Sequence, residues 1–182
     1  MEVTQTAIEG CLILRPRIVD DPRGYFMETY NERAFDEAVG QRVRFVQDNQ
    51  SFSTRGVIRG LHYQTSDFAQ AKLVRVIHGE VLDVAVDIRP GSETFGQHVA
   101  VKLSAENHLQ LFIPRGFAHG FAVLSETAVF AYKCDNFYNR ESEGGVRYND
   151  PELAIDWMVE DGLNISEKDL LLPPLKTARK AW

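Results

Sequence analysis

The strongest constraint on the fold is a stretch in which apolar and polar side chains alternate. Residues 82–88 read LDVAVDI, so every second side chain is a large aliphatic one. This two-residue period is typical of a strand that buries one face. The sequences HGE at 78–80 and RPGS at 89–92 bracket the stretch with turn signals. We therefore expect a half-buried strand here.

Short apolar or alternating runs of the same kind recur along most of the chain. They lie near residues 12–18, 25–30, 44–48, 57–63, 72–77, 97–103, 109–113, 119–124 and 127–134. Many short strands ended by turn residues predict an all-β sandwich or barrel. Helical signals are few: Asn31 is a suitable N-cap for a helix over 32–39 that Gly40 ends, and a second helix is expected to begin at Ser166. Residues 135–150 are predicted to form a long polar loop.

The size and composition of the chain indicate one ordinary globular domain. Its 182 residues are 44% hydrophobic and 25% charged, so we expect a single domain over 1–182 with a packed core. The formal net charge of −6 argues against general binding of nucleic acid or of an anionic membrane. No stretch has the ~20 apolar residues of a membrane span, and the first residues do not read as a signal peptide. Cys11 and Cys134 form no CxxC pair and suit a reducing compartment, where free cysteines act as small hydrophobic residues. A cytoplasmic protein is therefore expected.

Two segments carry a histidine in a setting where it could take part in chemistry. The first is RGLHYQ at 59–64, in which Arg59 and His62 are three positions apart at the end of a predicted strand. In a regular strand these side chains point to opposite faces, so a bulge or turn at Gly60 is needed to bring both into one cavity. A surface arginine and a hydrogen-bonded barrel histidine explain the same residues, and the local sequence slightly favours that interpretation.

The second segment, IPRGFAHGF at 113–121, is similar to the second cupin motif, PxGxxH, and places His119 at the start of a strand. In many cupins this histidine completes a metal site with an HxH pair and a glutamate, because a divalent metal needs three or four converging ligands. Here the region of the first motif offers only His62, and the remaining histidines show no metal-ligand spacing. We therefore expect a cupin without a catalytic metal. A histidine in the barrel core is an equally weighted interpretation of His119.

Three further side chains have both a structural and a functional interpretation. Tyr132 lies between apolar neighbours on a predicted strand, where a packed ring with a satisfied hydroxyl is more typical than an acid catalyst. Tyr138, in the polar loop, could stack on a nucleobase. Asp169 follows Ser166 in an S-x-x-D pattern before an apolar run, and this favours the far end of a capping box. Taken alone, these residues leave the function open.

Six stretches of sequence, spread over most of the chain, together carry a resemblance to a known family. They are DPRGYFMETYN at 21–31, FVQDNQS at 45–51, GVIRGLHYQ at 56–64, AQAKLVRVIHGEVLDVAVDIR at 69–89, IPRGFAHGF at 113–121 and YKCDNFYNRESEGGVRYNDP at 132–151. In their joint order and spacing they resemble the dTDP-4-dehydrorhamnose 3,5-epimerase family. The resemblance implies a cupin or jelly-roll β-barrel with a few short peripheral helices. It also implies a dTDP-4-keto-6-deoxyhexose as substrate, with no metal or other cofactor.

The resemblance also implies roles for individual side chains in inverting the carbons beside the keto group. A ketone at C4 acidifies the protons on C3 and C5, so a base on one face and an acid on the other can invert both centres through enolates. By the resemblance, His62 is the base, and Asp169 orients it and stabilises its charged form. Tyr132 reprotonates from the opposite face. Lys72 stabilises the enolate oxygen, an electrostatic role that is often the largest catalytic contribution.

The same resemblance assigns the residues that bind the nucleotide sugar. The groups expected at the diphosphate and its surroundings are Arg23, Arg59, His119 and Lys168. Tyr138 is expected to stack on thymine, and further polar contacts come from Glu28, Gln47, Asp48, Asn49 and Glu143. The family exchanges its N-terminal strands across a homodimer, so Arg23 and Glu28 are expected to serve the neighbouring subunit's site.

Three other functions stay open on the sequence. A single-position epimerase, acting at C3 or C5, would use the same residues, although Tyr132 favours two inversions. A metal-dependent cupin oxygenase or isomerase is disfavoured by the absent HxH pair. A sugar-nucleotide-binding module without catalysis would keep the binding residues and show no proton exchange.

Overall fold

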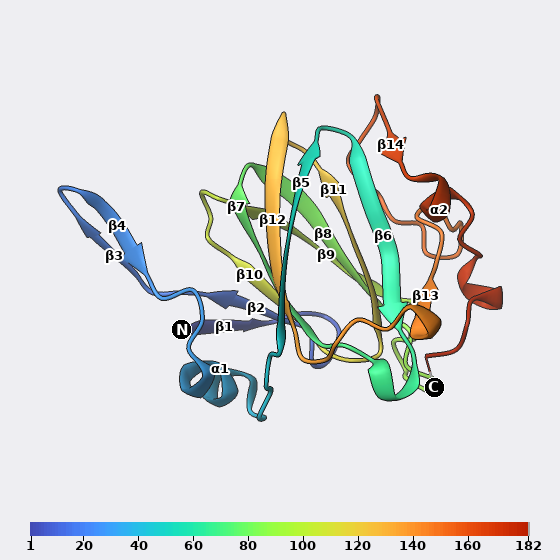
Figure 1. Cartoon of the computed structure of the whole chain (residues 1–182), viewed down its shortest axis with the longest axis horizontal. Coiled ribbons are helices and arrows are strands. Elements are labelled where there is room, and N and C mark those ends of the chain that lie inside the picture. Colours follow the sequence, from blue (N-terminus) through green and yellow to red (C-terminus); the bar gives the residue numbers. More distant parts are fainter. Residues whose placement is uncertain (182) are drawn as a thin grey trace.

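Two sheets that face each other form the body of the protein (Figure 1), in a computed structural model that describes residues 1–181. In spatial order the first sheet comprises β1 (Glu2–Gln5), β2 (Leu12–Arg15), β10 (Gln110–Ile113), β7 (Lys72–His78), β12 (Thr127–Cys134) and β5 (Gln47–Thr54). The second comprises β13 (Glu143–Gly145), β6 (Val57–Gln64), β11 (Phe117–Val123), β8 (Glu80–Asp87) and β9 (His98–Ser104), with β14 (Asn164–Ile165) paired in parallel to β6. The all-β barrel of cupin type is thus confirmed.

A separate hairpin projects from the body (Figure 1) and consists of β3 (Ile18–Asp21) and β4 (Gly24–Met27). Its apolar side chains are largely exposed: Phe26 retains 71% of its accessible surface and Tyr25 retains 56%. In contrast, β1 pairs with β2, and β2 pairs with β10 of the same chain. Within this one chain, β1 and β2 therefore belong to the first sheet, whereas the β3–β4 hairpin stands clear of the body (Figure 1).

Two short helices lie at the periphery of the barrel, at the two places that the sequence predicts. Helix α1 (Glu32–Val39) begins where the Asn31 side chain accepts a hydrogen bond from the Ala34 N–H at 3.1 Å, and it ends at Gly40, which has a left-handed φ of 72°. Helix α2 (Glu167–Leu170) is capped by Ser166. Three 3₁₀ turns cover Ser66–Phe68, Arg140–Ser142 and Leu175–Thr177. Among residues 1–181, no helix has the length and apolar character needed to cross a membrane.

The strand predicted over residues 82–88 is present as β8, but the prediction that it is half-buried is wrong, because β8 is buried on both faces. Its aliphatic side chains, such as Leu82 and Val84, lie in a cluster with Leu153 and Trp157 from the C-terminal part of the chain. Its other face points into the barrel and carries two fully buried carboxylates, Asp83 and Asp87. The predicted loop at 135–150 is also corrected, because it contains a 3₁₀ turn and β13, which pairs with β6.

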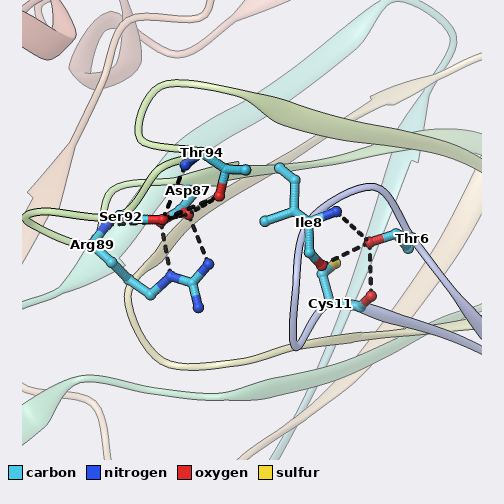
Figure 2. A network of polar contacts seen from close by, with 7 residues as sticks. All are labelled: Thr6, Ile8, Cys11, Asp87, Arg89, Ser92 and Thr94. Atoms are coloured by element: carbon cyan, nitrogen blue, oxygen red, sulfur yellow. Dashed lines mark hydrogen bonds and ion pairs between the residues drawn. The ribbon is translucent and has the colours of Figure 1, made fainter.

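Asp87 anchors the turn between β8 and β9 at one end of this face (Figure 2). Its carboxylate accepts hydrogen bonds from Arg89 at 2.7 and 3.0 Å, from Ser92 at 2.7 Å and from Thr94 at 2.6 Å. Burial alone would raise the pKa of Asp87, but the bonds from Arg89, Ser92 and Thr94 outweigh it and lower the pKa to about 2. The Asp87 carboxylate is therefore ionised in the folded protein at neutral pH.

Asp87→Asn is expected to lower the free energy of unfolding by about 2 kcal/mol at neutral pH, since the pKa falls from 3.8 to about 2 on folding. Because the folded pKa is the lower one, the contribution is complete above about pH 4 and is lost as the pH falls towards about 2. Urea unfolding across this range measures the difference between the two proteins. Glu93→Gln, at an exposed carboxylate of the same turn, is the control. A difference that stays constant down to about pH 2 would contradict the charged role of Asp87.

Candidate active site

A cavity of about 450 Å³ lies inside the barrel and contains most of the predicted catalytic residues. It is lined by side chains from β5, β6, β7, β11 and β12 and from the segment around α2. The predicted residues that it brings together are Arg59, His62, Lys72, His119, Tyr132, Lys168 and Asp169. Basic side chains thus gather in one place in a chain whose net charge is −6, so the cavity is suited to an anionic ligand.

A bulge in β6 lets Arg59 and His62 face the same cavity. The pairing passes from His119 opposite His62 to Phe121 opposite Arg59, which advances two residues along β11 and three along β6. Gly60 lies at the bulge with a φ of 125°, and a Cβ there would lie 2.6 Å from the Gly120 Cα. Only glycine therefore fits this position. The bulge that the sequence required at Gly60 is present.

His62 is oriented by a buried carboxylate. Its Nε2 lies 2.7 Å from Oδ1 of Asp169, and the other oxygen of Asp169 accepts from the Gly60 N–H at 3.3 Å. Burial alone would raise the pKa of Asp169, but the bonds from His62 and Gly60 outweigh it and lower the pKa. An ionised carboxylate only accepts hydrogen bonds, so it holds the proton on Nε2 and leaves Nδ1 of His62 as the basic nitrogen.

The capping interpretation of Asp169 holds for its backbone only. The Ser166 Oγ accepts from the backbone N–H of Asp169 at 3.1 Å, as in the first half of a capping box. The carboxylate turns to His62 and Gly60 instead of back towards Ser166. The same residue therefore begins a helix with its backbone and orients the histidine with its side chain.

Tyr132 and Lys72 enter the cavity from the sheet that faces His62. Burial and, to a lesser extent, the neighbouring Cys134 raise the pKa of the Tyr132 phenol, so it stays protonated at neutral pH. The Lys72 Nζ lies 5.9 Å from the centre of the Tyr132 ring. Burial lowers the pKa of Lys72, and the charges of Cys134, Asp83 and Glu143 oppose that effect. The cavity thus has an acid on one wall and an oriented imidazole on the other.

A second cavity of about 360 Å³ shares His62, Lys72 and Tyr132 with the first and extends it towards the polar segment after β12. It adds the predicted binding residues Gln47, Asn49, Tyr138 and Glu143. The Tyr138 hydroxyl donates to Glu143 at 3.2 Å, and the Lys168 ammonium donates to the same carboxylate at 2.6 Å. The Tyr138 ring itself is 56% exposed. An exposed aromatic ring beside a polar cavity offers a face on which a base can stack.

Three predicted binding residues lie away from both cavities. Arg23 is on the hairpin, where it pairs with Asp21, and Glu28 follows the hairpin. Asp48 points to the outer face of β5, where it accepts from the Lys133 ammonium at 2.9 Å. The alternation of β5 explains this position, because Gln47 and Asn49 on either side face inward. The substrate-binding role that the family resemblance gives to Asp48 stays a prediction.

The structure also shows residues that the sequence interpretation missed. Ser51, Asn164 and Ser166 line the first cavity. Asp83 lies behind it, with Oδ2 at 2.9 Å from the Nε2 of His119. In the sequence, only the position of Asp83 between aliphatic residues of β8 pointed to it. The face of the strand that carries this carboxylate proves to be buried. Within residues 1–181 there is no group of three or more His, Cys, Asp or Glu side chains that could hold a metal ion.

Comparison with known proteins gives consistent results. A family model described as dTDP-4-dehydrorhamnose 3,5-epimerase matches residues 5–177. A protein of that name from Shigella flexneri is 55% identical over 93% of this chain and 93% of its own length. The crystal structure of the 3,5-epimerase from Elizabethkingia anophelis has a TM-score of 0.94 at 54% identity, over 100% of this chain and 99% of that one. A dTDP-6-deoxy-D-glucose-3,5-epimerase from Legionella pneumophila, crystallised with dTDP-4-keto-L-rhamnose, has a TM-score of 0.94 at 51% identity, over 97% and 93% of the two chains.

Proposed function

The chain belongs to the dTDP-4-dehydrorhamnose 3,5-epimerase family, and from this premise we propose that His62 and Tyr132 carry out the epimerisation as base and acid. The protein is an isomerase of dTDP-rhamnose biosynthesis. It converts dTDP-4-dehydro-6-deoxy-D-glucose to dTDP-4-dehydro-L-rhamnose by inverting C3 and C5.

One observation carries the assignment of the two roles. His62 is on β6 of the second sheet and Tyr132 is on β12 of the first, and both line the same cavity. A sugar ring bound between the sheets therefore has a base on one face and an acid on the other. Inversion at a carbon requires this arrangement, because the proton must leave one face and return on the opposite face.

The chemistry proceeds as two similar proton transfers. Nδ1 of His62 removes the proton from C5 or C3, and the electron pair of the broken C–H bond moves to the C4 oxygen to form an enolate. The Lys72 ammonium stabilises the negative oxygen. Tyr132 then donates its phenolic proton to the same carbon from the other face, and the carbonyl re-forms. His62 loses its proton and Tyr132 regains one by exchange with water, so the net change is configuration alone.

Binding of the nucleotide part uses the remaining polar side chains. Arg59 and Lys168 are suited to the diphosphate, because guanidinium and ammonium groups bind phosphate oxygens through charge-assisted hydrogen bonds. The exposed ring of Tyr138 is proposed to stack on thymine, with Gln47 and Glu143 beside it. Stacking alone accepts several bases, so this contact supports affinity more than base selection.

The test of this function is proton exchange in deuterated water with dTDP-4-dehydro-6-deoxy-D-glucose, followed by NMR. We expect deuterium at both C3 and C5, and the same rate after treatment with a chelator. Deuterium at one carbon would indicate a single-position epimerase. Binding of the nucleotide sugar without exchange at either carbon would indicate a binding module and overturn the proposal.

We also propose that the protein acts as a homodimer in which the β3–β4 hairpin reaches the neighbouring subunit. The exposed Val19, Tyr25 and Phe26 side chains support this, since a projecting apolar hairpin is stabilised when a partner covers it. Arg23 and Glu28 lie on or next to the hairpin and away from their own chain's cavities. A partner's hairpin would bring these two residues to the site that the family resemblance assigns them.

Phe26→Asp is expected to shift the protein from dimer to monomer, because a carboxylate replaces a 71% exposed aromatic ring on the proposed contact. Light scattering coupled to gel filtration measures the mass of each form. Phe95→Asp, at a 50% exposed ring between β8 and β9, is the matched control and should stay dimeric. A monomeric parent protein, or a Phe26→Asp variant that remains dimeric, would contradict the role of the hairpin.

A further inference from the structure

Asp83 is a buried carboxylate that none of the proposed steps uses. It lies in the middle of β8 on the face that points into the barrel, and it is fully buried. Its Oδ2 lies 2.9 Å from the Nε2 of His119, while its Oδ1 has no hydrogen-bond partner among residues 1–181. A carboxylate buried with an unpartnered oxygen is costly to keep. It does not line either cavity, so any influence on the reaction must pass through its neighbours.

The first of these neighbours is His119. Because a carboxylate only accepts hydrogen bonds, the Nε2 of His119 must carry the proton that joins it to Asp83. Burial lowers the pKa of His119 more than the charge of Asp83 raises it, so the ring is neutral and its Nδ1 is unprotonated. The Phe130 ring stacks on the imidazole at 6.0 Å with an interplanar angle of 22°, which restricts its rotation. His119 thus presents a hydrogen-bond acceptor to the cavity.

The second neighbour is Lys72. Burial lowers its pKa, and the negative charges of Cys134, Asp83 and Glu143 oppose this. Cys134 contributes no charge at neutral pH, because burial raises the pKa of its thiol to about 11. Glu143 is already paired with Lys168 at 2.6 Å. Asp83 is therefore the fixed counter-charge of Lys72. The other ionisable side chains that line a cavity with Lys72 are Arg59, His62, His119, Tyr132, Lys168 and Asp169 in the first cavity and Tyr63, Tyr138 and Glu143 in the second.

We propose that Asp83 is a positioning residue of the epimerase, which holds His119 as an acceptor for a hydroxyl of the sugar and supplies the counter-charge of Lys72. This inference rests on the proposed function. The two effects act at different stages. A hydroxyl bound by His119 is held in the ground state, whereas the charge of Lys72 matters most as the enolate forms.

Two substitutions separate these effects. Asp83→Asn removes the charge but keeps an oxygen that can accept from His119, whereas Asp83→Leu removes both. We expect Asp83→Asn to lower kcat at least about 10-fold with little change in KM, because without the counter-charge Lys72 is protonated in a smaller fraction of molecules and an unprotonated amine stabilises the enolate less. The alkaline limb of its pH profile should also move to lower pH, because Lys72 loses its proton more readily without the counter-charge. Asp83→Leu should lower kcat similarly and raise KM as well.

Asp87→Asn is the matched control, since Asp87 is the other fully buried carboxylate on the same face of β8 and lies against Arg89 at the far turn. It should destabilise the protein and leave kcat, KM and the pH profile unchanged. Parental kcat and pH profile in Asp83→Asn, or equal shifts in Asp87→Asn, would overturn the inference. If the parent protein exchanges no protons at C3 or C5, the proposed function itself fails. If the parent exchanges them and Asp83→Asn does so equally, only the role of Asp83 fails.

A measurement on the unsubstituted protein covers the case in which the variants do not fold. Nitrogen NMR of the ligand-free protein at neutral pH should show His119 protonated at Nε2 and bare at Nδ1. The opposite tautomer, or a doubly protonated ring, would contradict the proposal. Neither result depends on the identity of the substrate.

Discussion

Replacing His62 by asparagine is expected to lower the rate of deuterium incorporation at both C3 and C5 by about 10²–10⁴-fold, the usual contribution of a general base. His62 lines the first cavity with its Nε2 held by the Asp169 carboxylate and its Nδ1 free to act as a base, and its side chain is 33% exposed, whereas that of His119 is 7% exposed. Asparagine has a similar size and keeps a hydrogen-bonding group for Asp169, so the cavity should persist. NMR in deuterated water gives the rate at each carbon.

The control for this experiment is His98→Asn, because His98 begins β9 and lies outside the two cavities. It should exchange protons at the parental rate. Binding of dTDP to His62→Asn should also be retained, since the nucleotide contacts come from other side chains. If His62→Asn still turned over at the parental rate, another residue would have to be the base, and the assignment of His62 would fail.

Replacing Tyr132 by phenylalanine should separate exchange from inversion. The variant keeps the base and the Lys72 charge, so His62 can still remove a proton and return deuterium to the same face. Reprotonation from the opposite face loses its acid, and product formation should fall by about 10²–10⁴-fold. We therefore expect deuterium to appear in recovered substrate of unchanged configuration. NMR distinguishes labelled substrate from product in a single sample.

Tyr30→Phe is the matched control, because Tyr30 packs against Phe35 and Phe45 outside the barrel cavity. It should form product at the parental rate. Product formation by Tyr132→Phe at the parental rate would mean that water or another side chain is the acid. Loss of exchange together with loss of product would instead mean that Tyr132 is needed before the proton leaves carbon.

Local chemistry predicted much of the fold. Asn31 and Gly40 bound α1 as expected, because caps depend on neighbouring residues alone. Strands β1, β13 and β14 were not predicted, and β5 was expected near 44–48 but lies at Gln47–Thr54. Its sequence, QDNQSFST, is polar because its inner face lines the cavities, so the usual apolar alternation is missing. A strand that builds a polar site lacks the very pattern by which strands are recognised.

Prediction of the site had different limits. Strand geometry gave the bulge at Gly60 as the condition for Arg59 and His62 to share one cavity. The contact of His62 with Asp169 joins residues 107 positions apart and came only from the family resemblance. Asp48 was assigned to substrate binding by the family resemblance alone, and strand alternation gives its side chain the face of β5 on which it pairs with Lys133. The alternation at 82–88 predicted a strand with one buried face, and Asp83 is on its other face. The pattern of one strand does not show what covers that face.

The orienting partner of His62 comes from α2, which follows every strand of the barrel in the chain. During synthesis, both walls of the cavity are therefore complete in sequence before Asp169 exists. The carboxylate that fixes the tautomer of His62 is absent until α2 has been made and has docked. A chain that ends before residue 169 is therefore expected to have the walls of the cavity without the carboxylate that orients its imidazole.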